Sequence, residues 1–314
     1  MPIGGTVKDV LPDPMLTGLA VELGTGGNYV SDIIAPVATV ARDTFKYATW
    51  SREDIKLDVR SQRAPGAAAN EVVISKSFTE GSVENRSLAM KIPDELRNNE
   101  PNQAALEARR VKVLTGKLKL QAEIAIATAL QAATGTLTAP TTKWDAANPT
   151  IRADILADKN AFRRQSGFNP THLVLPPVVA AAVFNNSQIL ELVKYTFGEL
   201  LKSGFIPMIE NMQVVVPGAI KDGSNPGAAQ SIADVYTSDE AYYLYVDPNA
   251  GSDLEAMTAL RQVRSMASVS TPFAAYKWRD PNPSAHTDWV AVDCNQKEVV
   301  LSQALIARKL DVLT

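Results

Sequence analysis

The stretch that decides the fold runs from Lys91 to Thr134 and reads KIPDELRNNEPNQAALEARRVKVLTGKLKLQAEIAIATALQAAT. Pro101 stands where a helix can begin, and no further proline occurs until Pro140. The residues between them are mostly strong helix formers. The stretch therefore predicts a helix from about Pro101 to Gln131, roughly 45 Å long at about 1.5 Å per residue. Because a compact chain of this length has a radius of gyration of only about 20 Å, the helix would cross the whole molecule.

The apolar residues of this helix fall on two stripes, whereas a helix at the rim of an ordinary core needs one. The first stripe holds Val111, Leu114, Leu118, Ala122 and Ala125, and the second holds Leu106, Val113, Leu120 and Ile124. Between the stripes lie Arg110 and Lys117 on one side and Lys112 and Lys119 on the other. Two interpretations stay open: a large domain packs on both stripes, or one stripe meets a neighbouring molecule. The basic residues, with Arg109, either form a solvated flank or face a polyanion.

Length and composition describe an ordinary folded protein. The chain has 314 residues, of which 46% are hydrophobic and 21% charged, and its net charge of -3 gives no overall basic footprint for nucleic acid. Cys294 is the only cysteine, which excludes an intrachain disulfide. The N-terminal sequence lacks the pattern of a signal peptide, and no run of 18 apolar residues occurs, so we expect synthesis in a reducing cytoplasm.

A search for catalytic and ligand-binding patterns gives almost nothing. His172 and His286 are far apart in the sequence, and no HExxH, GxGxxG, GxxxxGK[ST] or GxSxG motif occurs. Cys294 has no evident histidine partner. The sequence therefore predicts no catalytic residue, no cofactor and no metal. A hydrolase that uses Asp239 or Glu240 remains an alternative.

The segment before the long helix predicts an arm and a long hairpin. Residues 1–30 are rich in Gly, Pro and Thr, which is typical of a flexible arm. Residues 55–59 and 88–92 alternate apolar and polar side chains with the period of half-buried strands. Pro65-Gly66 lies between them as a turn. Residues 44–92 therefore predict an antiparallel excursion that packs on its own domain or on another subunit.

The segment after the long helix predicts an inserted domain and a closing sheet. Residues 150–262 read as a compact α+β domain with a polar loop at 219–231. Two neighbouring strands are then predicted at 288–293 and 298–306, joined by residues 294–297. Because residues 150–262 separate the long helix from these strands, we infer that they are inserted into a second domain.

This order of elements resembles the major capsid proteins of tailed bacteriophages, the Hong Kong 97 fold. Three pieces carry the resemblance in particular: SLAMKIPDELRNN at 87–99, RAPG at 63–66, and THLVLPPVVAAAVFNN at 171–186. The resemblance implies an α+β fold with an N-terminal arm (1–40), an extended β-hairpin loop (41–92), a peripheral domain with the spine helix (93–149 and 263–314), and an inserted axial α/β domain (150–262). One apolar stripe of the spine helix should then pack on the C-terminal sheet, around Trp289 and Val299.

The resemblance also implies partners and contacts. The chain would assemble with itself as hexamers and pentamers in an icosahedral shell around double-stranded DNA. It would also meet a portal, a separate scaffolding protein and a decoration protein, in a virion assembled in the host cytoplasm. The candidate subunit contacts are Trp50, Arg60, Arg63, Pro65, Gly66, Arg110, Lys117, Asp222 and Asn225.

Two further expectations qualify the resemblance. The founding member of the family is cross-linked through a loop lysine, but the predicted hairpin tip SQRAPGAAAN (61–70) has none, so covalent cross-links are not expected. A shell of the encapsulin type, which holds cargo enzymes in place of DNA, remains the alternative with the same fold.

Overall fold

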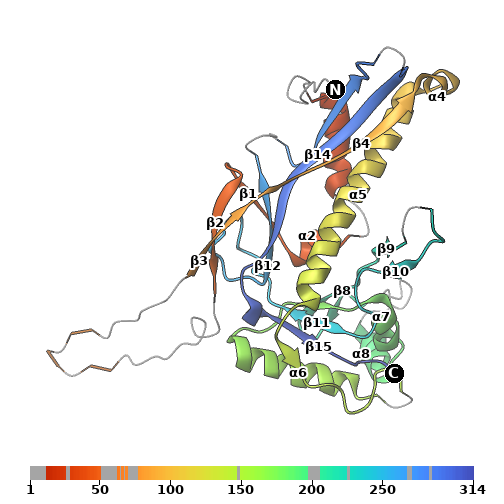
Figure 1. Cartoon of the computed structure of the whole chain (residues 1–314). Helices are drawn as coiled ribbons and strands as arrows, with labels where there is room; N and C mark the ends of the chain where they lie inside the picture. The colour runs from red at the N-terminus through yellow and green to blue at the C-terminus, as the bar shows by residue number, and fades with distance from the viewer. Residues whose placement is uncertain are drawn as a thin grey trace.

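The computed structural model describes residues 12–25, 29–50, 62–63, 65–66, 68–69, 77–146, 149–196, 206–224, 227–266, 271–282 and 285–314. One long helix, α5 (Gln103–Gln131), lies along a first sheet and ends against a second one (Figure 1). The Asn102 side chain caps this helix by accepting a hydrogen bond from the Ala105 N–H at 3.0 Å. The predicted helix is confirmed, with its start shifted to Gln103. The short helix α4 (Asp94–Asn99) precedes it.

The first sheet has β14 at its centre. Its strands are β1 (Val37–Val40), β12 (Leu260–Ser265), β14 (Thr287–Val300), β13 (Ala274–Arg279) and β4 (Glu84–Pro93). The order is β1-β12-β14-β13, and β4 pairs with β14 along its whole length. Only β1 and β12 run parallel; the other pairs are antiparallel. The alternation seen around residues 88–92 thus belongs to a ten-residue strand.

The prediction of two strands joined at residues 294–297 was wrong, because β14 runs through this segment without a break. The polar side chains of Asn295 and Gln296 are buried in the sheet, and the chain makes no turn at this point. The Gln296 side chain is 2% exposed, and its Oε1 accepts a hydrogen bond from Arg264 Nε at 3.1 Å. Pairing in the sheet therefore overrides the local preference of Asn295 for a turn.

One stripe of α5 packs on this sheet, as expected, but against different strand residues. Leu114 and Leu118 lie in a core with Val290 and Val292 of β14. Trp289 points to the other face, where its ring stacks on Trp278 with centroids 6.0 Å apart. This difference follows from the alternation of side chains along a strand. Val299 belongs to a separate cluster with Phe45 and Val263.

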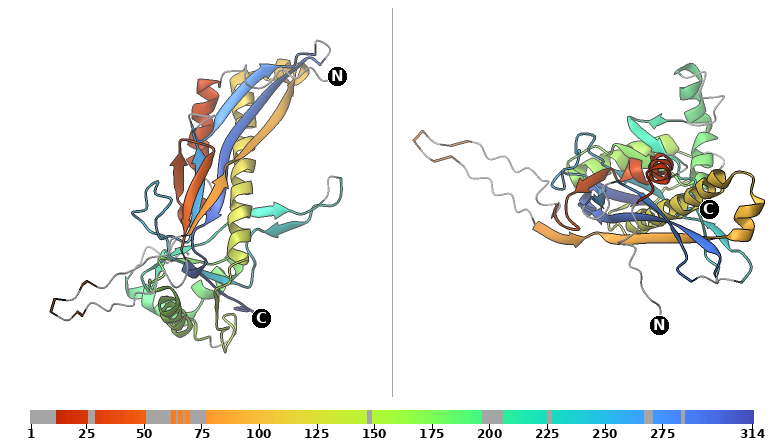
Figure 2. Two further views of the ribbon diagram at one scale, coloured as in Figure 1. Left: turned by 60° about the vertical axis from the view of Figure 1, so that its left-hand side comes forward. Right: turned by 90° about the horizontal axis from the view of Figure 1, so that it is seen from above.

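The second sheet lies at the C-terminal end of α5 (Figures 1 and 2). Its order is β5-β15-β11-β6-β8-β7. The strands are β5 (Thr136–Leu137), β15 (Ile306–Lys309), β11 (Ala241–Leu244), β6 (His172–Val174), β8 (Met212–Val215) and β7 (Met208–Ile209). Helices α6 (Ile151–Ser166), α7 (Pro177–Phe184) and α8 (Ser187–Thr196) accompany it. Gly167 ends α6 with a φ of 81°, as its sequence position suggested.

The sheets divide the chain differently from the boundaries expected at 150 and 262. β5 and β15 come from segments expected in the peripheral domain, yet both lie in the second sheet. A buried ion pair fixes β15 there, because Lys309 Nζ lies 2.9 Å from Asp158 Oδ2 of α6. β12 begins before residue 262 but pairs in the first sheet. Such long-range pairing has no local sequence signal.

The end of α5 belongs to a second, larger core that joins the two sheets. Ile126 and Leu130 pack there with Val174 and Leu244 of the second sheet. Leu260 of the first sheet reaches the same cluster. The second stripe of α5 is only partly used: Leu120 and Ile124 pack at the edge of this cluster, whereas Val113 is 46% exposed. One helix thus contributes to both cores.

The N-terminal segment is more ordered than expected. Residues 14–25 form helix α1 (Pro14–Thr25), although composition predicted a flexible arm. Asp13 Oδ1 caps it by accepting the Met15 N–H at 3.0 Å. Leu16 and Ala20 enter the core between α5 and the first sheet, which explains why the helix forms. Its low helix propensity is outweighed by this burial.

A polar junction holds the next segment, α2 (Ser31–Ile34), against α5. The buried Glu123 carboxylate accepts the Ser31 N–H at 2.8 Å and the Tyr236 O–H at 2.7 Å. Burial raises the pKa of Glu123 above the ordinary value of a glutamate. One turn earlier, Lys119 Nζ lies 3.9 Å from Asp32 Oδ2. Lys119 was expected on an exposed basic row, but it is buried.

The remaining elements are two short hairpins and a 3-10 helix. β2 (Thr44–Thr49) pairs with β3 (Ser77–Ser82), and β9 (Ile220–Asp222) pairs with β10 (Ile232–Asp234), both antiparallel. A short 3-10 helix, η2 (Gln303–Leu305), precedes β15. None of the helices in the described ranges has the length and apolar character needed to span a membrane.

We predict that Leu118→Asp prevents folding, whereas Lys117→Glu leaves a folded subunit. Leu118 is 3% exposed in the core, and Lys117 beside it is exposed. Leu118→Ala should lower the free energy of unfolding by about 2–5 kcal/mol, and a buried charge costs more. Circular dichroism and urea unfolding of the unassembled subunits measure this. An unfolded Lys117→Glu variant would show that the helix faces are assigned wrongly.

We also predict that Glu123→Gln stabilises the subunit at neutral pH and less so in acid. Since the folded pKa of Glu123 is raised, the ionised carboxylate costs stability above that pKa, and the cost disappears as pH falls and the folded state takes up the proton. Thermal unfolding from pH 8 down to pH 5 measures the difference between variant and wild type. Glu123→Ala, which leaves Ser31 N–H and Tyr236 O–H unpaired, should destabilise at every pH. A pH-independent gain for Glu123→Gln would contradict the assignment.

Candidate assembly surfaces

The root of the predicted extended loop is a two-stranded sheet that buries a side chain on each face. The register runs from Thr44 opposite Ser82 to Thr49 opposite Ser77. On one face Phe45 packs with Val263 and lies so close to Gly81 that a Cβ there would lie 2.8 Å from its ring. On the other face Ala48 is buried, whereas Phe78 opposite it is 54% exposed. The close approach at Gly81 therefore holds β2 and β3 together, and Phe45 and Ala48 hold them to the body.

Four candidate contact residues belong to the loop beyond this root. Arg63, Pro65 and Gly66 are all exposed. Gly66 has a φ of 81°, so the turn predicted at Pro65-Gly66 is confirmed. Arg60 lies outside the described residues.

Trp50 anchors the loop root instead of projecting from it. Its side chain is 8% exposed, and its Nε1 donates a hydrogen bond to the Glu255 carbonyl at 3.2 Å. Its backbone is held from both sides, because Trp50 N–H donates to the Leu301 carbonyl and Ser302 Oγ donates to the Trp50 carbonyl, both at 3.1 Å. Trp50 therefore belongs to the core of its own subunit and leaves little surface for a neighbour.

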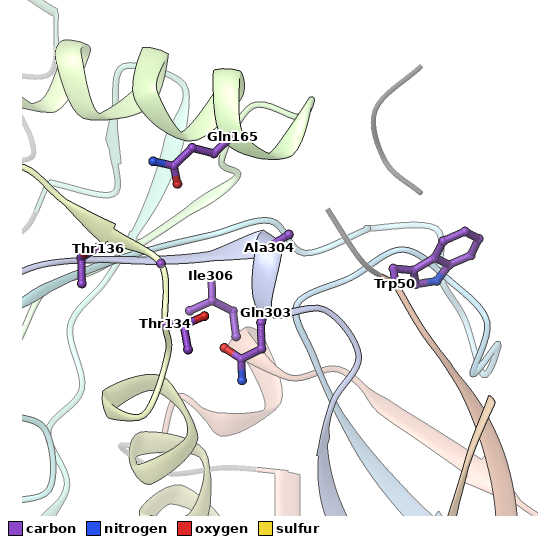
Figure 3. A pocket seen from close by; sticks show the side chains of 8 residues that line it. Trp50, Thr134, Thr136, Gln165, Gln303, Ala304 and Ile306 are labelled. Atoms are coloured by element: carbon purple, nitrogen blue, oxygen red, sulfur yellow. The ribbon is translucent and has the colours of Figure 1, made fainter. Parts of the chain in front are cut away.

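Trp50 also borders a pocket of about 400 Å³ between the loop root and the second sheet (Figure 3). The other lining residues are Thr134, Gly135, Thr136, Gln165, Gln303, Ala304 and Ile306. Among the described residues, the lining carries hydroxyl and amide groups but no charged side chain. Gly135 is required here, because a Cβ would lie 2.4 Å from the Ile306 carbonyl oxygen.

The basic residues of α5 divide between surface and interior. Lys117 is exposed and Arg110 half-buried, as candidates for a contact surface require. Arg109 pairs with Glu100 at 3.5 Å, an exposed ion pair of little energetic weight. Lys119 is turned inward onto Asp32. The predicted basic rows are therefore reduced to Arg110 and Lys117 on one side of α5 and Lys112 on the other.

The predicted polar loop at 219–231 is a β-hairpin, β9–β10, that projects beside α5 (Figure 1). Asp222 shapes its tip, because Asp222 Oδ1 accepts the N–H groups of Ser224 at 2.9 Å and Ser231 at 3.1 Å. These backbone hydrogen bonds lower the pKa of Asp222. Asn225 lies outside the described residues. All six strand residues are exposed.

Sequence reasoning missed the apolar members of these surfaces. Phe78, Ile220 and Ile232 are exposed by more than half of their surface. Each lies in a β-rich stretch, where a large apolar side chain ordinarily signals a core position. These side chains are exposed because no described part of the chain covers them. The sequence of each strand does not show whether another element will cover it.

Most of the groups considered for catalysis make contacts within the fold. Asp239 Oδ1 accepts the Leu313 N–H at 2.6 Å, which holds the C-terminal segment. Glu240 lies 3.9 Å from Arg308. His172 Nδ1 pairs with the neighbouring Thr171 hydroxyl at 2.8 Å, and His286 is exposed. In the part of the chain that the structure describes, no group of three or more His, Cys, Asp or Glu side chains could hold a metal ion.

Comparison with known proteins gives a likeness in structure alone. No family model matches the sequence, and no curated protein matches it. The fold is similar to that of a phage-related protein from Bordetella bronchiseptica RB50, with a TM-score of 0.70, 21% identity, and 96% of this chain and 98% of that chain covered.

Two further structures share the fold at lower similarity. The mature capsid of bacteriophage PhiM1 gives a TM-score of 0.57 at 14% identity, over 91% of this chain and 87% of that chain. A virus-like particle from Pyrococcus furiosus gives 0.54 at 10% identity, over 94% and 97%. Phage capsid structures dominate the similar structures. The chain therefore has the fold of phage capsid proteins.

Proposed function

We propose that this chain is a major capsid protein, which self-assembles as hexamers and pentamers into the icosahedral shell around the double-stranded DNA genome of a tailed phage. The observation that carries the proposal is the extent of the structural likeness, 96% of this chain and 98% of the phage-related protein. Phage capsid structures are among the other similar structures and also cover most of the chain.

The proposed organisation is of the Hong Kong 97 type. Residues 1–40 are the N-terminal arm, 41–92 the extended loop, 93–149 with 263–314 the peripheral domain, and 150–262 the axial domain. Because β5 and β15 complete the second sheet, the axial unit also takes in residues near 136 and 306. The role of the protein is structural, without catalysis.

The proposed contacts follow from exposure. Arg63, Pro65 and Gly66 near the loop tip are exposed and suited to reach a neighbouring subunit. Lys117 and Arg110 face the shell interior or a subunit seam, where non-specific contact with packaged DNA would use their charge. Trp50, a proposed contact, is held in the core of its own subunit at the end of β2. Asp222 shapes a projecting hairpin, and Arg60 and Asn225 remain proposed contacts.

Further partners belong to the same proposal. A separate scaffolding protein, a portal and a decoration protein would complete the particle, which is assembled in the host cytoplasm and becomes a virion. Many weak contacts, repeated over a closed lattice, would then hold the shell without covalent cross-links.

A nanocompartment shell that holds protein cargo is the second candidate. It is favoured by one observation, the likeness to the virus-like particle from Pyrococcus furiosus over 94% of this chain. Both candidates make the chain a shell subunit, and they differ in what the shell contains.

Expression of the full chain, alone and with candidate scaffolding proteins, tests the proposal. We expect closed icosahedral particles by electron microscopy and a fast-sedimenting species by analytical ultracentrifugation. Monomers or small oligomers under every assembly condition would contradict a shell role. DNA that resists nuclease inside native particles supports the capsid, whereas protein cargo without DNA supports the nanocompartment.

A further inference from the structure

A series of polar side chains crosses the first sheet from α2 to β4, and most of it is buried. It begins at Asp32 of α2, whose Oδ1 accepts hydrogen bonds from Gln262 Nε2 at 3.0 Å and from Arg264 Nη2 at 3.4 Å. Both donors lie on β12, the strand next to β14 in the sheet. Both are also buried, so their side chains depend on protein partners in place of water.

β14 continues this polar series to the far side of the sheet. Arg264 Nε donates to Gln296 Oε1 at 3.1 Å, and Gln296 Nε2 donates to Glu298 Oε1 at 2.6 Å. The Glu298 carboxylate accepts two hydrogen bonds from Arg86 of β4, at 2.9 Å from Nη1 and 2.7 Å from Nη2. Such bidentate pairs are among the stronger hydrogen bonds in proteins. Hydrogen bonds thus link Asp32 to Arg86 without a break.

The two ends of the polar series belong to segments that carry the projecting parts of the chain. α2 comes directly before β1 and follows the N-terminal segment with α1. β4 follows β3 of the loop root after Val83 alone, and from there it runs along β14 to α4 (Figure 1). The polar series therefore connects the predicted arm to the predicted extended loop through the body of the subunit.

The middle of the polar series is cross-connected. Gln262 Oε1 lies 3.4 Å from both Arg264 Nη2 and Gln296 Nε2. Each of these three side chains therefore has more than one partner within the series. A buried polar group that loses its partner is costly, so the loss of one end favours rearrangement of the next member.

We propose that this polar series couples the N-terminal segment to the extended-loop strand, so that freeing Asp32 loosens β4 and freeing Arg86 loosens α2. A coupling free energy acts equally in both directions. The coupling is a property of the single subunit and goes beyond the proposed shell function. It would let a contact made by the arm act on the loop, and a contact made by the loop act on the arm.

Hydrogen–deuterium exchange of the unassembled full chain tests the coupling from both ends. We expect Asp32→Ala to speed exchange about threefold or more in residues 84–93, and Arg86→Ala to do the same in residues 29–35. The matched control is Lys46→Ala, which removes an exposed ion pair with Glu80 at the loop root and should leave residues 29–35 unchanged. Faster exchange confined to the mutated end would overturn the coupling. If an alanine variant does not fold, Asp32→Asn and Arg86→Lys give the same comparison.

Cys294 provides a second readout in the middle of the polar series. It is the only cysteine, it is buried, and its Sγ donates to Gln296 Oε1 at 3.4 Å. Burial raises the pKa of this thiol to about 11, so we expect slow reaction with DTNB until the sheet opens locally.

The rate of this labelling separates coupled from independent ends. We expect Asp32→Ala and Arg86→Ala each to speed the labelling of Cys294. The double variant should speed it by less than the product of the two single effects, because either loss already opens the polar series. Effects that multiply show independent ends and overturn the proposal. A labelling rate that neither single variant changes overturns it as well.

Discussion

The packing of α5 into two separate cores is the constraint on which the rest of the structure depends. Its middle, with Leu114 and Leu118, is buried against β14 and α1, and its end, with Ile126 and Leu130, is buried between the two sheets. At about 25 cal/mol for each Å² of apolar surface, each contact is worth several kcal/mol. Because a single helix crosses from one core to the other, neither core can shift without moving the other. The two sheets and α5 therefore form one packed unit, from which the β2–β3 and β9–β10 hairpins project.

Buried polar groups fix the positions of elements that apolar packing alone would not determine. The Asp32 carboxylate of α2 accepts a hydrogen bond from Gln262 Nε2 at 3.0 Å. It also lies near Lys119 and Arg264. Glu123 holds the start of α2 and the Tyr236 segment at the same level of α5. Buried charges add little net stability when paired, but they are costly when unpaired, so they favour one arrangement over its neighbours. The N-terminal segment is thereby fixed where α5 passes between the sheets.

Much of this fold could be predicted from local signals, and the exceptions share one physical cause. The range of α5, the strand around Leu88–Ile92 and the end of α6 at Gly167 all follow from propensity, alternation and turn chemistry. The continuous β14, the inward turn of Lys119 and the place of β15 depend on partners more than a hundred residues away or on burial. For the candidate surfaces, the sequence indicated the exposed loop residues near Pro65-Gly66 and the exposed Lys117. It could not reveal Ile220 and Ile232, because their exposure depends on where the neighbouring sheet ends.

The joining of two cores by α5 is the central claim, since α1, α2 and both sheets are placed by their packing on this one helix. Hydrogen–deuterium exchange of the unassembled subunit, followed by mass spectrometry, measures this directly. We expect amides of α5 near Leu114–Leu118 and near Ile126–Leu130 to exchange slowly and at similar rates, together with those of β14. Fast exchange confined to residues 126–130 and the second sheet, with β14 still protected, would contradict it by showing two units that open independently.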